Sequence, residues 1–200
     1  MCLPAGVKFF VFMNEVYQPI DFRPLQENDL DISYKWFLTD HVIKWYSKKA
    51  WTLSEVKAKF LPRVLGTEPT RCFLILLAEK PIGQIQMYKI DDYPKYKKMI
   101  QIDENAAGVD IFIGEEDYLH KGLGSIIIKK FLQDFVFLKL DVDTCIIGPD
   151  PKNLAAIKAY QKAGFNYFKT ILNTEENAEE YLMKIKKENI NKKCIKNLII

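Results

Sequence analysis

Three features in the second half of this 200-residue chain have the residue types and spacing that a group-transfer reaction needs. Asp110 interrupts an apolar segment, residues 109–114, where a carboxylate is costly to bury unless it has a partner or a task. A glycine-rich turn at residues 121–125 then opens an apolar segment with helical spacing, and Tyr160 follows on a second predicted helix. A turn suited to phosphates, placed between a carboxylate and a phenol, suggests group transfer from a phosphate-bearing carrier.

The glycine turn predicts a site for phosphate groups. Backbone N–H groups of residues 120–125 would lie free at the start of a helix, where the helix dipole also favours an anion. A Gly-x-Gly turn commonly serves only a tight backbone geometry. Here the position of the turn between a predicted strand and a predicted helix favours the phosphate interpretation.

The predicted helix that carries Tyr160 presents a second polar side chain on the same face. Asn153, Ile157 and Tyr160 are spaced i, i+4 and i+7, so they share one helix face across two turns. A phenol with a pKa near ~10 is protonated at neutral pH and can give its proton to a leaving group. The alternative is that Tyr160 is a core residue beside Gly164 and Phe165.

Two further carboxylates precede the Asp110 segment. Asp103 and Glu104 lie on a polar, turn-rich segment, residues 91–107, which predicts a long loop. Acidic loops attract polycations, and Asp110 itself is suited to accept a proton from an amine. The alternatives are a solvated polar loop for the pair and a structural hydrogen bond to backbone donors for Asp110.

The composition predicts one soluble globular domain. Hydrophobic residues make up 48% of the chain, charged residues make up 28%, and the net charge is +3. The lysines are scattered, which argues against nucleic-acid binding, and no apolar run reaches the length of a membrane span. The four cysteines form no Cys-x-x-Cys pair and only two histidines are present, so no metal site is predicted. Free cysteines indicate a reducing compartment, the cytoplasm.

The hydrophobic pattern predicts an α/β fold with an antiparallel first half and helical crossovers in the second. We expect an N-terminal extension at residues 1–19, a single domain at residues 20–185 and a basic C-terminal tail at residues 186–200. The predicted strands cover residues 20–25, 71–78, 81–90, 109–114, 144–148, 167–172 and 181–185, and the predicted helices begin near residues 28, 52, 122 and 150. Alternation on the third of these strands places Gln84, Gln86 and Tyr88 on one face.

The order of these features resembles the Gcn5-related N-acetyltransferase superfamily, and within it the aminoglycoside 6'-N-acetyltransferases, over residues 20–185. Residues 153–165 are similar to the coenzyme-binding helix of the superfamily. Residues 108–114 are similar to the strand that carries an Asp in the aminoglycoside branch. Further matches to that branch are Trp45-Tyr46, Thr52-Leu53 and Pro81-Ile82-Gly83.

Two positions depart from the family pattern. Leu119 stands where Arg or Gln usually begins the coenzyme loop. Gly148 stands where family members often have an acidic residue, and Asp150 lies two residues further on. The resemblance therefore leaves the range of aminoglycosides open.

The resemblance implies a mixed, splayed central sheet flanked by helices, with acetyl-coenzyme A entering between parallel strands at residues 108–114 and 143–148. It implies that Asp110 is the base or ammonium anchor and Tyr160 the acid, with direct attack in a ternary complex and no metal. The implied coenzyme contacts are Ile111, Phe112, Ile113, His120, Lys121, Gly122, Leu123, Gly124, Ser125, Asn153 and Tyr160. The implied substrate contacts are Trp45, Tyr46, Gln86, Tyr88, Asp103, Glu104 and Asp110.

The implied activity is acetyl transfer to the 6'-amine of an aminoglycoside antibiotic, which removes a positive charge and weakens binding to ribosomal RNA. The alternative acceptors are another polyamine, a siderophore precursor or a protein N-terminus. Asp110 favours the polycationic acceptor, because siderophore-type relatives tend to have His at this position. A coenzyme A-binding module without turnover is the alternative from another class, and Asp110 and Tyr160 together argue against it. Core packing is an equally good explanation of Trp45 and Tyr46.

Overall fold

A single open sheet runs through the whole molecule. The computed structural model describes residues 10–13 and 16–190, so residues 1–9 of the predicted extension and residues 191–200 of the predicted tail lie outside the described residues. The sheet has eight strands in the order β1-β2-β3-β4-β5-β6-β8-β7. The strands are β1 (Phe10–Met13), β2 (Val16–Pro24), β3 (Arg71–Leu77), β4 (Lys80–Lys89), β5 (Ala106–Ile113), β6 (Thr144–Ile147), β7 (Asn166–Asn173) and β8 (Ala178–Lys186).

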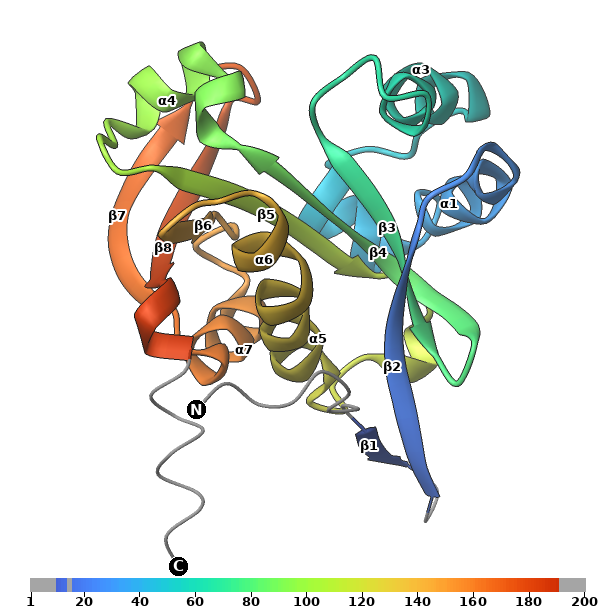
Figure 1. The fold of residues 1–200 in the computed structure, drawn as a ribbon. Helices are drawn as coiled ribbons and strands as arrows, with labels where there is room; N and C mark the ends of the chain where they lie inside the picture. Colours follow the sequence, from blue (N-terminus) through green and yellow to red (C-terminus); the bar gives the residue numbers. More distant parts are fainter. Residues whose placement is uncertain (1–9, 14–15, 191–200) are drawn as a thin grey trace, which may run out of the picture.

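The pairing of β5 with β6 is the only parallel pairing recorded between the described strands, and it is short. Ala106, Ala107 and Gly108 pair with residues 144–146, and beyond Gly108 the two strands separate. β5 continues along β4 as far as Ile113, while β6 follows β8. The predicted mixed, splayed sheet is therefore confirmed (Figure 1).

The helices cover the two faces of this sheet. The longer ones are α1 (Leu30–Trp36), α3 (Leu53–Val64), α4 (Pro94–Ile100), α5 (Leu123–Phe131) and α7 (Leu154–Ala163). The shorter ones are η1 (Glu27–Asp29), α2 (Asp40–Val42), the π-helical turns η2 (Ile43–Ser47) and η5 (Leu132–Val136), η3 (Ile90–Asp92), η4 (Glu116–Tyr118) and α6 (Phe137–Lys139). Figure 1 shows α5, α6 and α7 together over the middle of the sheet, and α1 with α3 beside β3 and β4.

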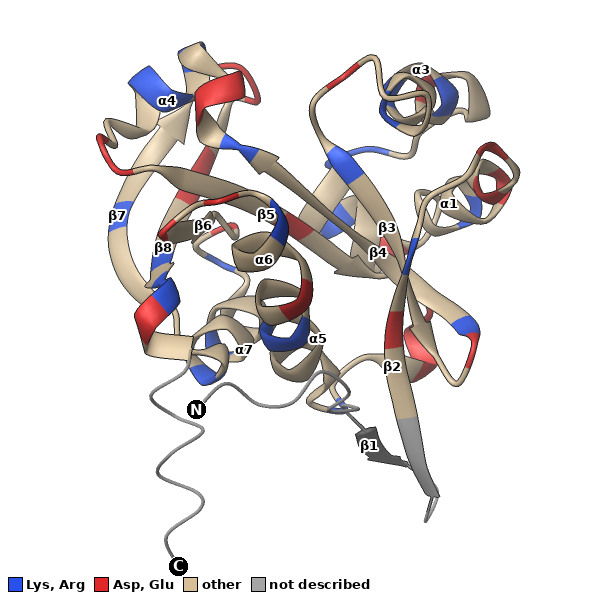
Figure 2. Ribbon diagram, in the orientation of Figure 1, with Lys and Arg blue, Asp and Glu red and all other residues tan. Residues whose placement is uncertain are grey.

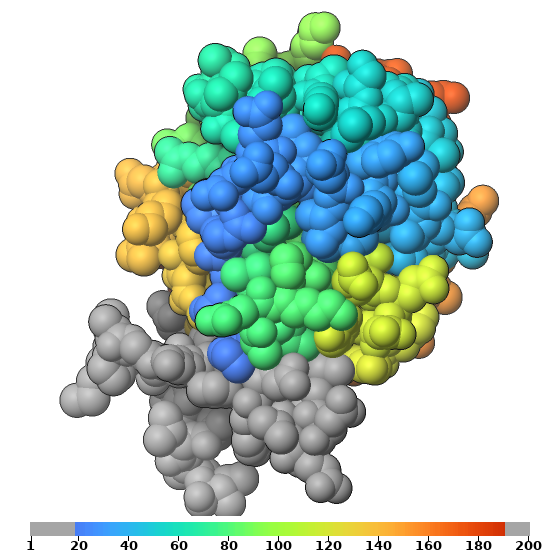
Figure 3. All heavy atoms as spheres, turned by 90° about the vertical axis from the view of Figure 1, so that its right-hand side faces the viewer, coloured from blue at the N-terminus to red at the C-terminus, as the bar shows by residue number. Residues whose placement is uncertain are grey.

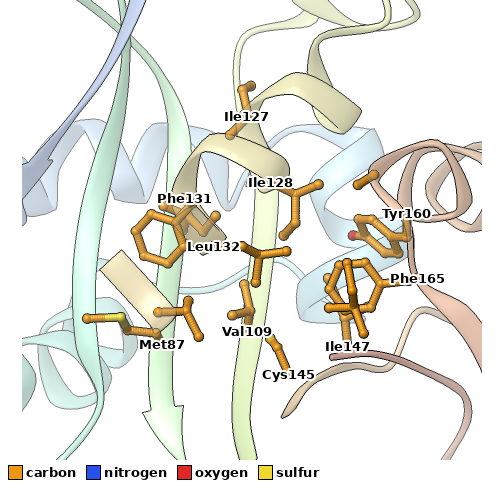
Figure 4. Packing of buried hydrophobic residues seen from close by; sticks show 14 of the residues in the cluster. Met87, Val109, Ile127, Ile128, Phe131, Leu132, Cys145, Ile147, Tyr160 and Phe165 are labelled. Carbon is orange, nitrogen blue, oxygen red and sulfur yellow. The ribbon is translucent and has the colours of Figure 1, made fainter. Parts of the chain in front are cut away.

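One face of the sheet packs against α5 and α7. Ile127, Ile128 and Phe131 come from consecutive turns of α5 and are fully buried, as their helical spacing predicts. These side chains share one cluster with Met87 and Val109 of the neighbouring strands β4 and β5, and Figure 4 shows Phe131 nearest to Met87 and Ile127 farther away. Tyr160 of α7 belongs to the same cluster.

The opposite face packs against α1 and α3. Phe37 stacks on Trp51 with ring centroids 4.7 Å apart, and Phe112 of β5 lies edge-on to Phe37 at 5.5 Å. α3 begins where predicted, because Thr52 and Glu55 form a reciprocal capping box. Figure 3 shows the chain from α1 to α3, coloured blue to cyan, as one continuous surface on this side of the molecule.

Two predictions about the chain outside the central strands are wrong in detail. Residues 91–107 do not form a long loop, because Pro94 at the first helical position opens α4, which ends at Ile100. The first strand is longer than predicted, since β2 starts at Val16 and β1 pairs with it. At the other end, β8 runs to Lys186 and Ile190 is buried.

Candidate active site

Two adjoining cavities open where β5 and β6 separate. The first has a volume of about 570 Å³ and lies between β5, the start of α5 and α7. The second, of about 330 Å³, lies between α3, β4, α4 and the turn that joins β7 to β8. The residues that line both cavities are Trp45, Tyr46, Asp110, Ile147 and Gly148.

The first cavity has the features of an anion site. Gly122 caps α5 with a left-handed φ of 77°, and no side chain caps the N–H groups of the first helical turn. The hydroxyl of Ser125 donates a hydrogen bond to the carbonyl of Gly122 at 3.1 Å. The backbone N–H of Ser125 belongs to the uncapped N–H groups of the first helical turn. Lys158 and Lys162 of α7 add positive charge to the lining. Of the described residues that line this cavity, Asp110 is the only one with a carboxylate.

The start of α7 differs from the prediction. Asn153, and not Asp150, is the N-cap, and its Oδ1 accepts a hydrogen bond from the backbone N–H of Ala156 at 3.1 Å. The carboxylate of Asp150 accepts hydrogen bonds from Lys48 Nζ at 2.8 Å and from the N–H of Lys152 at 2.9 Å. Asn153 therefore lines the first cavity from the position just before α7. It does not lie on the helix face that carries Tyr160, contrary to the prediction from the i, i+7 spacing.

Tyr160 lines the first cavity and is almost fully buried. The side chain is 8% exposed, and its ring centroid is 6.2 Å from that of Phe165. Burial, and then the negative charge of Asp110, raise the pKa of the phenol above its ordinary value. The phenol is therefore held in its protonated form, as a general acid requires. Figure 4 shows the ring between Ile128 and Phe165.

Asp110 lies at the junction of the two cavities. It stands opposite Gln86 in the β4–β5 pairing, and Gln86 Nε2 donates to Asp110 Oδ2 at 2.7 Å. Burial raises the pKa of the carboxyl, while the hydrogen bond from Gln86 and the charges of Lys59 and Arg63 oppose that rise. A carboxylate with a raised pKa is a better proton acceptor than an exposed one.

Asp110 and Tyr160 reach this place from opposite faces of the sheet. Alternation along β5 puts Asp110 on the face of α3, with Phe112, while Val109 faces α5. Tyr160 belongs to the cluster on the α5 side. The two side chains line one cavity because β6 no longer covers β5 after Gly108.

The second cavity is rich in carboxylates. Six acidic side chains line it against three basic ones, Lys48, Lys59 and Arg63. The acidic residues are Asp110, Asp150, Glu175, Glu176, Glu179 and Glu180. Figure 2 shows Asp and Glu, in red, where β7 and β8 turn beside α4, and Lys and Arg, in blue, on α3. A cleft with this lining attracts polycations.

Most of these carboxylates were missed by sequence reasoning, which named only Asp110 and Asp150 among the six. Asn173 shapes the β7–β8 turn, since its Oδ1 accepts from the N–H groups of Glu175 at 3.0 Å and Glu176 at 3.2 Å. Its Nδ2 donates to Glu180 at 2.6 Å, and the hydroxyl of Tyr96 donates to the same carboxylate at 2.8 Å. Burial raises the pKa of Glu180. The available signal was the density of acids across residues 175–180.

The structure brings most of the predicted site residues to the two cavities. Every predicted coenzyme contact except Lys121 lines the first cavity, and Trp45, Tyr46, Gln86, Tyr88 and Asp110 line the second. Asp103 and Glu104 lie outside both cavities. Glu104 accepts a hydrogen bond from Lys184 Nζ at 2.6 Å and another from Thr144, and these bonds lower its pKa. Its role in the structure is to join β6 and β8, away from the acidic cavity.

Trp45 and Tyr46, considered for substrate contact or for core packing, both lie at the junction of the cavities, and Tyr46 also packs in the core. They lie on η2, and Tyr46 packs edge-on against Phe112 with centroids 4.7 Å apart. Both side chains also line both cavities. Packing and lining are compatible for Tyr46, whose ring centroid also lies 5.9 Å from that of Phe37.

The residues placed in the structure contain neither a metal-binding cluster nor a membrane-spanning helix. No group of three or more His, Cys, Asp or Glu side chains in this part of the chain is arranged to hold a metal ion. Likewise, none of its helices is both long enough and apolar enough to span a bilayer.

The sequence model of the family described as the acetyltransferase (GNAT) domain matches residues 26–172. The chain belongs to the GNAT acetyltransferase family. Among relatives of this GNAT chain, aminoglycoside N(6')-acetyltransferase type 1 of Klebsiella pneumoniae is 28% identical over 162 residues, which cover 80% of each protein. A kanamycin resistance protein of Rhizobium radiobacter is 34% identical over 65 residues, which cover 32% of this chain and 59% of that protein.

Solved structures of GNAT proteins share the fold. The aminoglycoside acetyltransferase AAC(6')-Ib, solved with paromomycin and acetyl-coenzyme A, is similar with a TM-score of 0.72 and 25% identity, covering 86% of this chain and 96% of that one. An uncharacterised protein of Bacillus halodurans has a TM-score of 0.78 at 24% identity, covering 92% and 93% of the two chains, and shows the fold alone.

We predict that Asp110→Asn stabilises this GNAT domain at neutral pH. Burial raises the pKa of Asp110 in the native state above its value in the unfolded chain, so the native state keeps this proton to a higher pH. The free energy of unfolding therefore falls as the pH rises from the pKa of the unfolded chain to the pKa of the native state. Above that window the substitution should raise the unfolding temperature by about 2–4 °C. The gain should vanish at pH ~3, where the wild-type carboxyl is protonated as well.

Thermal unfolding at pH 7 and pH 3 measures this difference. Asp103→Asn is the matched control, because it removes an exposed carboxylate outside both cavities and should leave the unfolding temperature unchanged. An Asp110→Asn variant that is less stable than wild type at pH 7 would show instead that Asp110 is a structural hydrogen-bond partner.

Proposed function

We propose that the protein transfers an acetyl group from acetyl-coenzyme A to the 6'-amine of an aminoglycoside antibiotic and thereby confers resistance. The observation that carries the proposal is the position of Asp110, which lines both the anion-suited first cavity and the acidic second cavity. A carboxylate there is placed to meet the amine of one substrate beside the acyl group of the other. The relatives named above support this choice of substrates.

The first cavity fits the coenzyme. The free N–H groups at the start of α5 suit its diphosphate, and Lys158 and Lys162 are of the right sign. On the side that β6 has left, β5 has no strand partner beyond Gly108, so backbone groups of residues 111 and 112 can bind the amide-containing arm of the coenzyme. The carbonyl of Ile113 instead lies 2.9 Å from Nε2 of His41. When bound, acetyl-coenzyme A supplies the acetyl group as a thioester.

The chain's own residues would supply the proton transfers. Asp110 would take a proton from the acceptor ammonium, which frees the amine to form the new C–N bond. Tyr160 would give its proton to the sulfur as the C–S bond breaks, and the second N–H proton, lost as the amide forms, would restore the phenol. The carboxylates on the β7–β8 turn would hold the other ammonium groups of the acceptor. The buried free thiols of Cys72 and Cys145 agree with a cytoplasmic location for this reaction.

One observation favours a second class of acceptor. Lys59 lines the second cavity, with its Nζ 4.9 Å from the ring centroid of Trp51 and 5.9 Å from that of Tyr46. Burial, and then Arg63, lower its pKa. Among residues 19–190, it has no recorded ion pair with a carboxylate. An acceptor that carries a carboxylate beside its amine, as an amino-acid-like siderophore precursor does, would place that group against Lys59.

Thiol release from acetyl-coenzyme A tests the proposal. We expect kanamycin and tobramycin to be acetylated, with the product identified by NMR as the 6'-amide, and Asp110→Asn to abolish turnover while coenzyme binding persists. Spermidine, a hydroxylated lysine and a short peptide are the comparison acceptors. The proposal fails if the wild-type protein, saturated with acetyl-coenzyme A, leaves both aminoglycosides unmodified and acetylates one of these.

We predict that Tyr160→Phe lowers the maximal rate and leaves coenzyme affinity intact. The substitution keeps the ring that packs near Phe165 and removes only the proton donor. General acid assistance is typically worth ~10²–10⁴-fold, and the lower end applies where a thiolate leaves easily. Single-turnover kinetics and calorimetry separate the two effects. A variant that turns over at the wild-type rate, with chemistry rate-limiting, would show that Tyr160 only packs.

We predict that Gly124→Val weakens acetyl-coenzyme A binding by at least ~10-fold, equal to ~1.4 kcal/mol. A Cβ at Gly124 would lie 3.5 Å from the Cβ of Ala159, an ordinary contact, so alanine fits between α5 and α7. The two further methyl groups of valine would enter the lining of the first cavity. Calorimetry measures the affinity, and Gly124→Ala is the matched control that should bind almost normally. Equal affinities in folded Val and wild-type proteins would exclude this part of the cavity from the coenzyme site.

A further inference from the structure

We propose that Arg63 is a positioning residue for Asp110, because it fixes the amide of Gln86 in the one orientation that donates a hydrogen bond to the Asp110 carboxylate. The kinetic part of this inference rests on the proposed acyl transfer, whereas the structural part does not. It adds a residue of α3, outside every motif found in the sequence, to the machinery of the site.

A continuous chain of hydrogen bonds leads from the surface to Asp110. Glu68 accepts from Arg63 Nε at 3.0 Å, and Arg63 Nη1 donates to Gln86 Oε1 at 2.8 Å. Gln86 Nε2 then donates to Asp110 Oδ2 at 2.7 Å. The chain crosses from α3 through β4 to β5, so it joins the helix layer to the strand that carries the carboxylate.

The hydrogen-bonding capacity of each group allows only one orientation of the Gln86 amide. A guanidinium has donors and no acceptor, so the side of Gln86 that faces Arg63 must be its oxygen. The thiol of Cys72 donates to the same oxygen at 3.4 Å. The amide nitrogen therefore faces Asp110, where an ionised carboxylate accepts its hydrogen bond.

Burial makes this orientation costly to lose. Gln86 is 6% exposed, so water does not readily replace a lost partner. A flipped amide would put its carbonyl against the carboxylate and its nitrogen against the guanidinium, which loses two hydrogen bonds and opposes like charges. Arg63 is held in turn by Glu68 and by the ring of Phe60, whose centroid is 5.6 Å from the guanidinium carbon.

The burial of Asp110 makes such support necessary. Burial disfavours charge at this position, whereas the hydrogen bond from Gln86 and the charges of Lys59 and Arg63 favour it. The groups that interact electrostatically with Asp110 are Lys59 and Arg63 of α3, Tyr46 of η2, Cys72 of β3, Gln86 and Tyr88 of β4, Tyr96 of α4, Cys145 of β6, Tyr160 of α7 and Glu180 of β8. Removing Arg63 takes away both a positive charge and the restraint on Gln86.

A double-mutant cycle followed by carboxyl ¹³C NMR tests the inference without turnover. The Asp110 titration is measured in wild type, Arg63→Met, Gln86→Leu and the double variant. We expect Arg63→Met to move the midpoint upward by about one pH unit. Because Arg63 acts through Gln86, the shift in the double variant should be smaller than the sum of the two single shifts. The acid limb of kcat/KM against pH should move in parallel.

Two further variants control for charge and for folding. Lys57→Met removes an exposed positive charge from the same helix and should leave the titration unchanged. Arg63→Lys keeps the charge and one donor, and it should give an intermediate shift even if Arg63→Met unfolds. Thermal unfolding and acetyl-coenzyme A affinity are measured for each variant.

Two results would overturn the inference. One is an unchanged Asp110 midpoint in a folded Arg63→Met protein. The other is full additivity in the double variant, which would mean that Arg63 acts by charge alone. If the NMR shifts follow expectation while the wild-type protein acetylates no aminoglycoside, the proposed function fails and the positioning role of Arg63 stands.

Discussion

The separation of β5 from β6 after three paired residues is the constraint on which the site depends. A continuous sheet keeps the side chains of its two faces apart, because strand backbones and their hydrogen bonds lie between them. Here the partnership ends at Gly108, two residues before Asp110, and the first cavity opens in the gap. A carboxylate from one face and the phenol of Tyr160 from the other can therefore line the same space. The short parallel ladder is stabilised by the α5 and α7 cluster that packs over it.

Keeping Asp110 ionised at this position costs free energy. Burial disfavours the ionised form and raises the pKa of the carboxyl. The charge is stabilised by the hydrogen bond from Gln86 and by the positive charges of Lys59 and Arg63 on α3. Among the residues that the structure describes, no ion pair within 4.0 Å neutralises the carboxylate. This arrangement leaves the second carboxylate oxygen available to an incoming amine. A helix that packs against the aromatic cluster thus also sets the electrostatics of the second cavity.

Much of the fold and part of the site could be predicted from sequence. Strand alternation correctly placed Gln86 on one face of β4, and the glycine turn correctly marked the start of α5. The predictions failed where long-range contacts decide the outcome. Asp103 and Glu104 precede β5 in sequence, yet Glu104 is taken up by Lys184 of β8, while the acidic wall comes from the β7–β8 turn some 70 residues later. The α4 helix was missed because its seven residues are too few for a clear periodic pattern, and Arg63 gave no signal because only tertiary packing brings it to Gln86.

The β7–β8 turn has a consequence for how such a protein can diverge. Its carboxylates lie on an exposed connection that carries none of the groups proposed for proton transfer or for holding the coenzyme. Exposed turns tolerate substitutions and insertions at little cost in stability. Mutations there can therefore redistribute the charge that the acceptor meets, one residue at a time, while β5, α5 and α7 stay as they are. Substitutions in this turn are therefore the simplest way for such a protein to adapt to a new amine, because they leave the groups proposed for acetyl transfer unchanged.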